Sequence, residues 1–255
     1  MRNIRHLATF ITFVLGMIPP AEAALCEARS GPTRNPVIEL YTSEGCSSCP
    51  PADRWLSTFR SLPTGDALQP VVMAFHVSYW DYIGWIDRFA QPAFNERQRE
   101  LARRESRKSV YTPQVVRDGM DWPRWFSQNA KDINTPKANA EPAGATIQLR
   151  RTDSGTVEAA VTPVSPTRQW SAFWTVTEDG HASKVRAGEN RGETLRHDFV
   201  VRHLEMTPPQ QGPARISMKV PSATAGHAQR VNLVVMDAAN QKPLQALSLG
   251  CEYSR

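Results

Sequence analysis

The sequence predicts an α/β domain followed by an all-β, sandwich-like domain. In the first half, apolar runs of strand length alternate with segments that have helical spacing, which is typical of a sheet covered on both faces. In the second half, short strand-like runs follow one another with turn signals between them. A stretch rich in Lys, Asn, Pro and Ala separates the two halves, so we expect domains over residues 35–136 and 145–252.

The N-terminus predicts a secretory signal peptide over residues 1–23. Arg2 and Arg5 give a positive start, the apolar segment 7–18 is too short to span a bilayer, and Ala21-Glu22-Ala23 has the small-x-small cleavage pattern. We therefore expect cleavage after Ala23 and a periplasmic or secreted protein. No later run is long and apolar enough for a membrane helix, so we expect no stable membrane insertion after cleavage.

Composition argues against several function classes. The formal charge of +5 falls to about +4 once two arginines and one glutamate leave with the signal (5 − 2 + 1). No basic stripe is interleaved with aromatic residues, so we expect no nucleic-acid partner. The chain also contains no Gly-rich phosphate loop and no nucleophile elbow, and we expect no cofactor.

The elements of the first half follow from apolar spacing and from proline and glycine positions. Pro50 and Pro51 suit the first turn of a helix, and Pro92 opens another. Asp118-Gly119 is a hairpin-turn signal. The expected order is a strand over 37–42, a helix over 50–62, a strand over 70–77, a helix over 92–108, a short strand over 114–116 and a helix over 121–133.

Charged residues alternate along the helix predicted over 92–108. This alternation favours a solvated, salt-bridged face over an anion-binding site. The residues concerned are Glu96, Arg97, Arg99, Glu100, Arg103, Arg104, Glu105 and Arg107.

The second half predicts seven strands. Asp179-Gly180 and Ala239-Asn240 are among the turn signals between them, and this short spacing favours a sandwich. Gly188-Glu189-Asn190 has the composition of a turn, with a binding loop as the alternative. The expected strands cover 146–150, 156–161, 170–177, 195–201, 215–220, 230–236 and 244–249.

Cys46-Ser47-Ser48-Cys49 carries the strongest indication of chemistry. It follows a predicted strand and precedes a predicted helix, so Cys46 would lie at a helix N-terminus, where unpaired N–H groups favour a thiolate. Cys49 is one turn away and is placed to close a ring and expel a mixed-disulfide partner. We therefore expect Cys46 to attack and Cys49 to resolve.

The other cysteines predict a structural disulfide. Cys26 lies just inside the mature N-terminus and Cys251 lies near the C-terminus, and chain ends are often close together. We expect a Cys26–Cys251 bridge, although four cysteines allow three connectivities.

Two alternatives remain open for the CxxC pair. The first is an inert local disulfide. The second is a metal clip, in which His76 at the end of the second strand joins Cys46 and Cys49 as a ligand set for copper(I). His197, His203 and His227 show no metal-ligand spacing.

The order of elements resembles a thioredoxin-like core. The opening run from Val37 to Cys49 is similar to the start of glutaredoxins, and Thr112-Pro113 matches the position of their cis-proline loop. The resemblance implies a cis bond that lets Thr112 and Pro113 present backbone to an extended substrate beside the disulfide.

Longer motifs resemble one exported bacterial family, catalogued as domain of unknown function 1223. The motifs are ELYTSEGCSSCPPAD, FHVSYWD, VYTPQ, AGENRG and His197-Asp198. The resemblance covers nearly the whole mature chain. It implies an exported protein with a thioredoxin-like domain and supplies no activity or substrate.

Departures from well-studied thioredoxins leave the redox direction open. Gly45 replaces the usual tryptophan, Ser47-Ser48 replaces the usual central pair, and the Glu44 carboxylate would raise the pKa of Cys46. The aromatic loop over 78–90 either caps the sheet edge or lines a substrate groove. In the second case Trp80 contacts substrate and Asp81 assists proton transfer from Cys49.

These observations lead to one functional hypothesis and two alternatives. We expect an exported thiol–disulfide oxidoreductase whose partners are exported protein thiols or a redox partner protein. The alternatives are a non-catalytic binding protein with a structural Cys46–Cys49 bridge and a copper(I) carrier.

Overall fold

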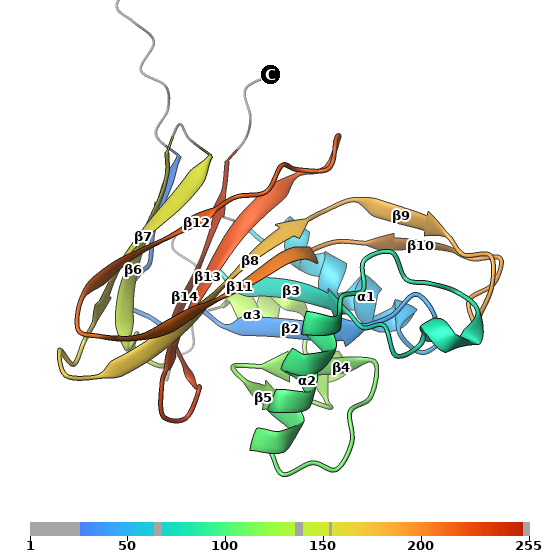
Figure 1. Cartoon of the computed structure of the whole chain (residues 1–255), viewed down its shortest axis with the longest axis horizontal. Coiled ribbons are helices and arrows are strands. Elements are labelled where there is room, and N and C mark those ends of the chain that lie inside the picture. Colours follow the sequence, from blue (N-terminus) through green and yellow to red (C-terminus); the bar gives the residue numbers. More distant parts are fainter. Residues whose placement is uncertain (1–25, 64–67, 136–139, 153–154, 252–255) are drawn as a thin grey trace, which may run out of the picture.

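The computed structural model describes residues 26–63, 68–135, 140–152 and 155–251 (Figure 1). The predicted signal peptide over 1–23 lies outside the described residues, and so does part of the predicted linker. None of the described helices combines the length and the apolar character that a membrane crossing requires.

One eight-stranded sheet forms the centre of the molecule (Figure 1). The strand order is β14 (Pro243–Gly250), β13 (Gln229–Asp237), β8 (Gln169–Glu178), β11 (Val200–Gln211), β3 (Val71–His76), β2 (Val37–Thr42), β4 (Gln114–Arg117) and β5 (Met120–Asp121). β2 and β3 lie parallel in the middle of the sheet, while β8, β13 and β14 pair antiparallel at one end.

A four-stranded sheet packs on one end of the large sheet. Its strands, in order, are β1 (Glu27–Arg29), β6 (Ala145–Arg151), β7 (Thr156–Pro163) and β12 (Ala214–Lys219). The two sheets enclose a core in which Ile147 meets Trp170, Trp174 and Leu233. Every second residue of β6 is buried, as expected for a strand with one solvated face. The core at this end of the molecule therefore lies between two packed sheets.

Helices cover both faces of the other end of the sheet. Because side chains alternate along a strand, Ile38 and Leu40 of β2 face one side and Tyr41 faces the other. The first face is covered by α1 (Pro50–Ser57), η1 (Thr58–Ser61) and α3 (Ala130–Asn134). The second is covered by α2 (Pro92–Arg104), through Phe94.

The predicted fold class, an α/β thioredoxin-like domain followed by a separate all-β domain, is wrong. β3 is joined to β11: Val200 pairs with Ala74 in parallel, and the Ala74 N–H donates to the Phe199 carbonyl at 2.8 Å. Strands from 35–136 and from 145–252 therefore share one sheet, and β structure dominates the chain. Composition marks the break in the chain but does not reveal which strand edges form hydrogen bonds across it.

Several local predictions also differ from the structure. The expected helix over 121–133 is replaced by η3 (Trp125–Ser127) and the short α3, whose N-cap Asn129 forms a capping box with Asp132. The expected strand over 195–201 is divided between β10 (Thr194–His197) and β11. β10 pairs with β9 (His181–Lys184) in a two-stranded hairpin that contacts α1 (Figure 1).

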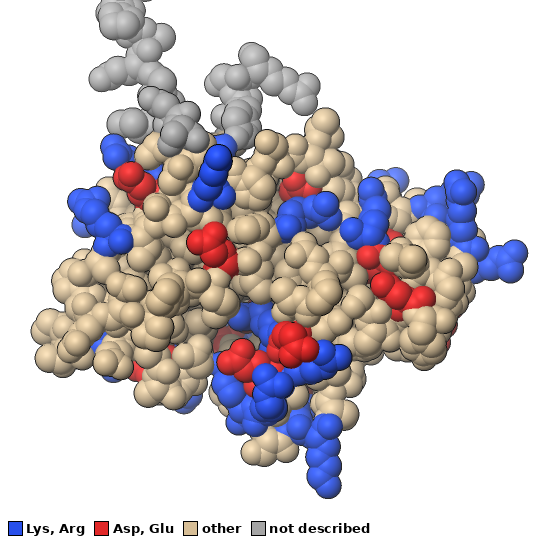
Figure 2. All heavy atoms as spheres, viewed as in Figure 1, with Lys and Arg blue, Asp and Glu red and all other residues tan. Residues whose placement is uncertain are grey.

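The charged face predicted for α2 is present, with one exception. Positive and negative side chains intermingle around this helix in Figure 2, and Arg99 pairs with Glu96 at 2.5 Å. Arg97 instead turns inward and holds Glu39 of β2 with two hydrogen bonds of 2.8 Å. Its guanidinium also lies 3.9 Å from the centre of the Phe173 ring. This arginine is therefore part of the core.

Candidate functional site

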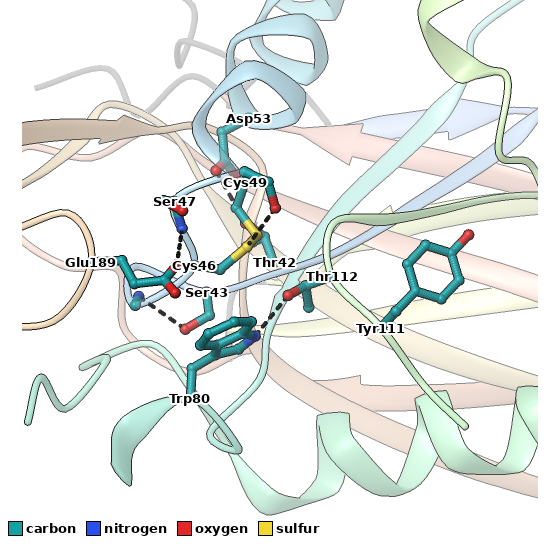
Figure 3. Close-up of a disulfide and its surroundings, with 12 residues drawn as sticks. Thr42, Ser43, Cys46, Ser47, Cys49, Asp53, Trp80, Tyr111, Thr112 and Glu189 are labelled. Atoms are coloured by element: carbon teal, nitrogen blue, oxygen red, sulfur yellow. Dashed lines mark hydrogen bonds between the residues drawn. A yellow bond between two sulfur atoms is a disulfide. The ribbon is translucent and has the colours of Figure 1, made fainter. Parts of the chain in front are cut away.

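Cys46 and Cys49 form a disulfide at the start of α1 (Figure 3). β2 ends at Thr42, and the chain turns so that the Cys46 N–H donates to the Ser43 carbonyl at 3.2 Å. Cys49 is the N-cap of α1, and its carbonyl accepts the N–H groups of Ala52 and Asp53. The disulfide thus lies at the positive end of the helix dipole.

Both sulfur-bearing residues are buried. Cys46 is 1% exposed and Cys49 is 0% exposed. The cover over Cys46 comes from the loop between β9 and β10, whose residues Glu189 and Asn190 we name the hairpin tip. Asn190 Nδ2 donates to the carbonyls of Glu44 at 2.9 Å and of Cys46 at 3.0 Å. The Ser47 N–H donates to the Glu189 carboxylate at 2.9 Å, so the tip closes over the turn that carries the disulfide.

Removal of the Asn190 amide is expected to open this cover. Each of its two hydrogen bonds contributes about 1 kcal/mol, so Asn190→Ala should favour opening by about 2 kcal/mol, or roughly 30-fold. We expect dithiothreitol to reduce the Cys46–Cys49 bond roughly 10- to 30-fold faster than in the unmodified protein. Stopped alkylation followed by mass analysis measures this rate.

The control for this variant is Glu193→Gln, an exposed change in the same loop, which should leave the reduction rate unchanged. Equal rates for all three proteins would contradict the capping role.

Trp80 and Thr112 border the disulfide on the side opposite Asp53 (Figure 3). The Trp80 indole N–H donates to Thr112 Oγ1 at 2.7 Å, which ties the aromatic loop to the Thr112-Pro113 turn. The Thr112-Pro113 peptide bond is cis. A Cβ at Gly45 would lie 3.1 Å from the Trp80 Cβ, which explains why a glycine precedes Cys46. Trp80 therefore occupies the space that a larger residue at position 45 would need.

Asp81 orders the aromatic loop. It lies in η2 (Asp81–Ile83), and its Oδ1 accepts the Asp87 N–H at 3.2 Å. Partial burial raises its pKa, and the neighbouring Asp87 charge adds to this shift. This hydrogen bond connects Asp81 to Asp87, which belongs to a buried polar cluster near the disulfide.

This buried cluster begins with Glu44 and Asp87. The Glu44 N–H donates to Asp87 Oδ2 at 2.9 Å, and the Trp85 indole N–H donates to Glu44 Oε2 at 2.8 Å. His76 Nδ1 lies 2.7 Å from Asp87 Oδ2, and both side chains are fully buried. Burial opposes ionisation of Asp87, but its interactions with His76 outweigh burial and lower the pKa of Asp87.

His197, from the end of β10, completes the cluster. Its Nε2 lies 3.3 Å from Glu44 Oε1 and its Nδ1 lies 3.8 Å from Asp53 Oδ1. Burial disfavours the imidazolium, but the carboxylates of Asp53 and Glu44 outweigh burial and raise the pKa of His197 to about 10. Burial likewise opposes ionisation of Glu44, and His197 is the first of the groups that lower the Glu44 pKa.

The structure distributes the remaining predicted site residues as follows. Cys26 and Cys251 form a disulfide with a Cα–Cα distance of 5.8 Å beside the sandwich core. Within the described residues, one group of potential metal ligands has its ligand atoms within 4.8 Å of one another, and it consists of Asp53, His76 and His197. His76 is therefore grouped with a carboxylate and a second imidazole, not with the two sulfurs.

Sequence reasoning missed Asp53, His197 and the hairpin tip as neighbours of the CxxC. Asp53 follows Cys49 by four positions, so helical spacing alone places it near the helix start. The hairpin tip and His197 lie in the β9–β10 hairpin, more than 140 residues after Cys46 in the chain. Their only sequence signal is the pair of motifs AGENRG and His197-Asp198.

Comparison with known proteins identifies the family. A family model described as "Protein of unknown function (DUF1223)" matches residues 37–236, which include the CxxC, the aromatic loop and the hairpin tip. The chain belongs to the DUF1223 family. The family membership expected from its motifs is thus confirmed. A comparison of this DUF1223 protein with curated proteins found no match.

Two solved structures resemble this DUF1223 member. The crystal structure of a protein from Agrobacterium tumefaciens has a TM-score of 0.67 at 21% identity, covering 89% of this chain and 98% of that one. HBP35 of Porphyromonas gingivalis has a TM-score of 0.59 at 13% identity, covering 88% of this chain and 77% of that one. At these identities the likeness concerns the fold alone.

Proposed function

We propose that this DUF1223 protein is an exported thiol–disulfide oxidoreductase that exchanges electrons between its Cys46–Cys49 pair and a protein partner. The observation that carries the proposal is the Cys46–Cys49 disulfide at the N-terminus of α1. The helix dipole there stabilises a thiolate, which is both the attacking and the departing species in exchange. Two disulfides in one chain support an oxidising compartment.

The exchange passes two electrons and two protons between the pair and a partner dithiol. A partner thiolate attacks Cys46, the Cys46–Cys49 bond breaks, and Cys49 departs as a thiolate that then takes up a proton. The partner's second thiolate then attacks the partner's first sulfur in the mixed disulfide, and Cys46 departs as a thiolate. The partner is oxidised to a disulfide and the protein is reduced to a dithiol. Every step reverses, so the relative potentials decide the direction.

Access to Cys46 requires displacement of the hairpin tip. Cys46 is 1% exposed and Asn190 holds its carbonyl, so we propose that an attacking sulfur reaches it after these hydrogen bonds open. Once the tip moves, the backbone of Thr112-Pro113 and the face of Trp80 border the exposed sulfur. We propose these residues as the contact surface for an extended segment of the partner.

The reduction potential tests this function. We expect the Cys46–Cys49 couple, equilibrated with glutathione or dithiothreitol and quantified by thiol alkylation, to lie above about −300 mV, in the range of exchange-active pairs. The same protein should reduce insulin or oxidise a model dithiol. The Cys26–Cys251 pair is the internal comparison and should remain oxidised. A Cys46–Cys49 potential below about −300 mV with no turnover in either assay would contradict the proposal.

The burial of Cys46 favours a second candidate, a binding protein in which Cys46–Cys49 is a permanent staple. In that case the aromatic loop and the hairpin tip serve a ligand or partner, and reduction of the bond changes nothing but local stability. The potential and the turnover assays separate the two candidates.

A further inference from the structure

We propose that Asp53, His76 and His197 bind a divalent transition-metal ion, for which Zn²⁺ is the best match. The three residues come from α1, β3 and β10. Each offers one ligand atom, and these atoms all lie within 4.8 Å of one another. Imidazole nitrogen and carboxylate oxygen are the donors that Zn²⁺ takes outside thiolate sites. This site is separate from the sulfur chemistry proposed above.

His76 is oriented as a metal ligand. Its Nδ1 lies 2.7 Å from Asp87 Oδ2, so the Nδ1–H donates to the carboxylate and Nε2 keeps its lone pair. Asp87 is itself fixed, because it accepts the N–H groups of Glu44 and Phe89. His76 Nε2 is buried and has no hydrogen-bond partner among the described residues. A carboxylate behind a histidine is the usual support for a metal-binding imidazole.

His197 lies between two carboxylates. Its Nε2 faces Glu44 Oε1 at 3.3 Å and its Nδ1 faces Asp53 at 3.8 Å, but neither nitrogen is aligned for a hydrogen bond. Glu44 is held by the Trp85 indole through Oε2, which leaves Oε1 beside His197 Nε2. His197 Nδ1 is then the nitrogen that faces the metal.

Asp53 presents its second oxygen to the same point. Oδ2 accepts the Thr42 hydroxyl at 3.0 Å, which leaves Oδ1 on the side of His197 Nδ1. Zn²⁺ bonds of about 2.0–2.2 Å require the three ligand atoms to approach one another from their present separations. Within the described residues His197 Nδ1 has no hydrogen-bond partner, so no hydrogen bond has to break for it to approach an ion.

Charge and access also support a cation at this point. The carboxylates of Asp53 and Glu44 are buried, and a buried negative pair requires a positive charge between them. A bound dication at this point supplies that charge. Asp53 and His197 also line a surface cavity of about 140 Å³ between the start of α1 and β10, which gives an ion a route from solvent.

Metal binding by the oxidised mature protein, produced without a histidine tag and treated with chelator, tests this proposal. Calorimetric titration with Zn²⁺ should give one ion per chain while the Cys46–Cys49 disulfide stays closed. X-ray absorption of the zinc-loaded protein should show imidazole and oxygen neighbours at about 2.0–2.2 Å and no sulfur at about 2.3 Å. Because the sulfurs remain oxidised, this result is independent of whether the protein catalyses thiol exchange.

Variants locate the site. Asp53→Asn and His197→Gln should each weaken zinc affinity by at least about 10- to 100-fold. His203→Gln, which changes a partly exposed histidine of β11, is the matched control and should bind as the unmodified protein does. Circular dichroism establishes whether each variant is folded. If a variant does not fold, the X-ray absorption spectrum of the zinc-loaded unmodified protein tests the site instead.

Three results would overturn the proposal. They are no zinc binding by the folded unmodified protein, sulfur in the first coordination shell, and unchanged affinity in both folded ligand variants. In the first case the cluster is an ion-pair network centred on His197.

Discussion

The Cys46→Ser variant is expected to show no thiol–disulfide exchange above the background of the assay. Cys46 is the proposed attacking sulfur, and serine provides neither a nucleophile nor a leaving group for exchange. Insulin reduction and dithiol oxidation should both fall to the level of buffer alone. Cys49→Ser should instead retain attack at Cys46 and accumulate mixed disulfides, which non-reducing electrophoresis and mass analysis detect.

The other disulfide provides the control for this pair of variants. A Cys26→Ala/Cys251→Ala protein keeps the CxxC and should retain exchange activity for as long as it is folded. If Cys46→Ser traps partners and Cys49→Ser does not, then Cys49 is the attacking sulfur and Cys46 the resolving one. Full activity in both single variants would refute the proposed function.

The Arg97→Met variant is expected to lose about 3–5 kcal/mol of unfolding free energy, because it leaves the Glu39 carboxylate buried without its partner. Arg97 makes two hydrogen bonds to Glu39, and Tyr41 donates a third. Burial opposes the charge of Arg97, but the attraction of Glu39 outweighs burial and raises the pKa of Arg97 above its usual value. Urea denaturation monitored by tryptophan fluorescence measures the loss.

Two further proteins sharpen this test. Arg99→Met removes an exposed i,i+3 pair with Glu96 on the same helix and should cost less than about 1 kcal/mol. A Glu39→Leu/Arg97→Met double variant should recover much of the loss, because it removes both buried charges and leaves one unpaired Tyr41 hydroxyl. A loss below 1 kcal/mol for Arg97→Met alone would mean that Glu39 is solvated after the change.

Local chemistry made part of this molecule predictable. Pro50 and Pro51 after Cys49 marked the start of α1, and alternation along β6 marked a strand with one buried face. Asp118-Gly119 marked a turn that the structure places between β4 and β5, with positive φ at both residues. Each of these signals acts within a few residues of the chain.

The features that sequence reasoning missed depend on distant segments. The alternation of Arg and Glu along α2 gives no sign that Arg97 alone turns inward, because its partner Glu39 lies 58 residues away. The joining of β3 to β11 depends on which two strands become neighbours, and that choice has no signature within either strand. Asp53, His76 and His197 lie in three separate segments, so no ligand spacing links them.

The position of the hairpin tip also has a consequence for how the protein is made. Asn190 lies 144 residues after Cys46, and a ribosome adds roughly 5–20 residues per second, so the two are synthesised on the order of ten seconds apart. Until residues 181–197 have been synthesised, the nascent chain lacks the segment that caps the CxxC. The interval between Cys26 and its partner Cys251 is longer still. Both disulfides therefore join or adjoin segments that are synthesised far apart in time: the CxxC precedes its cap by 144 residues, and Cys26 precedes Cys251 by 225.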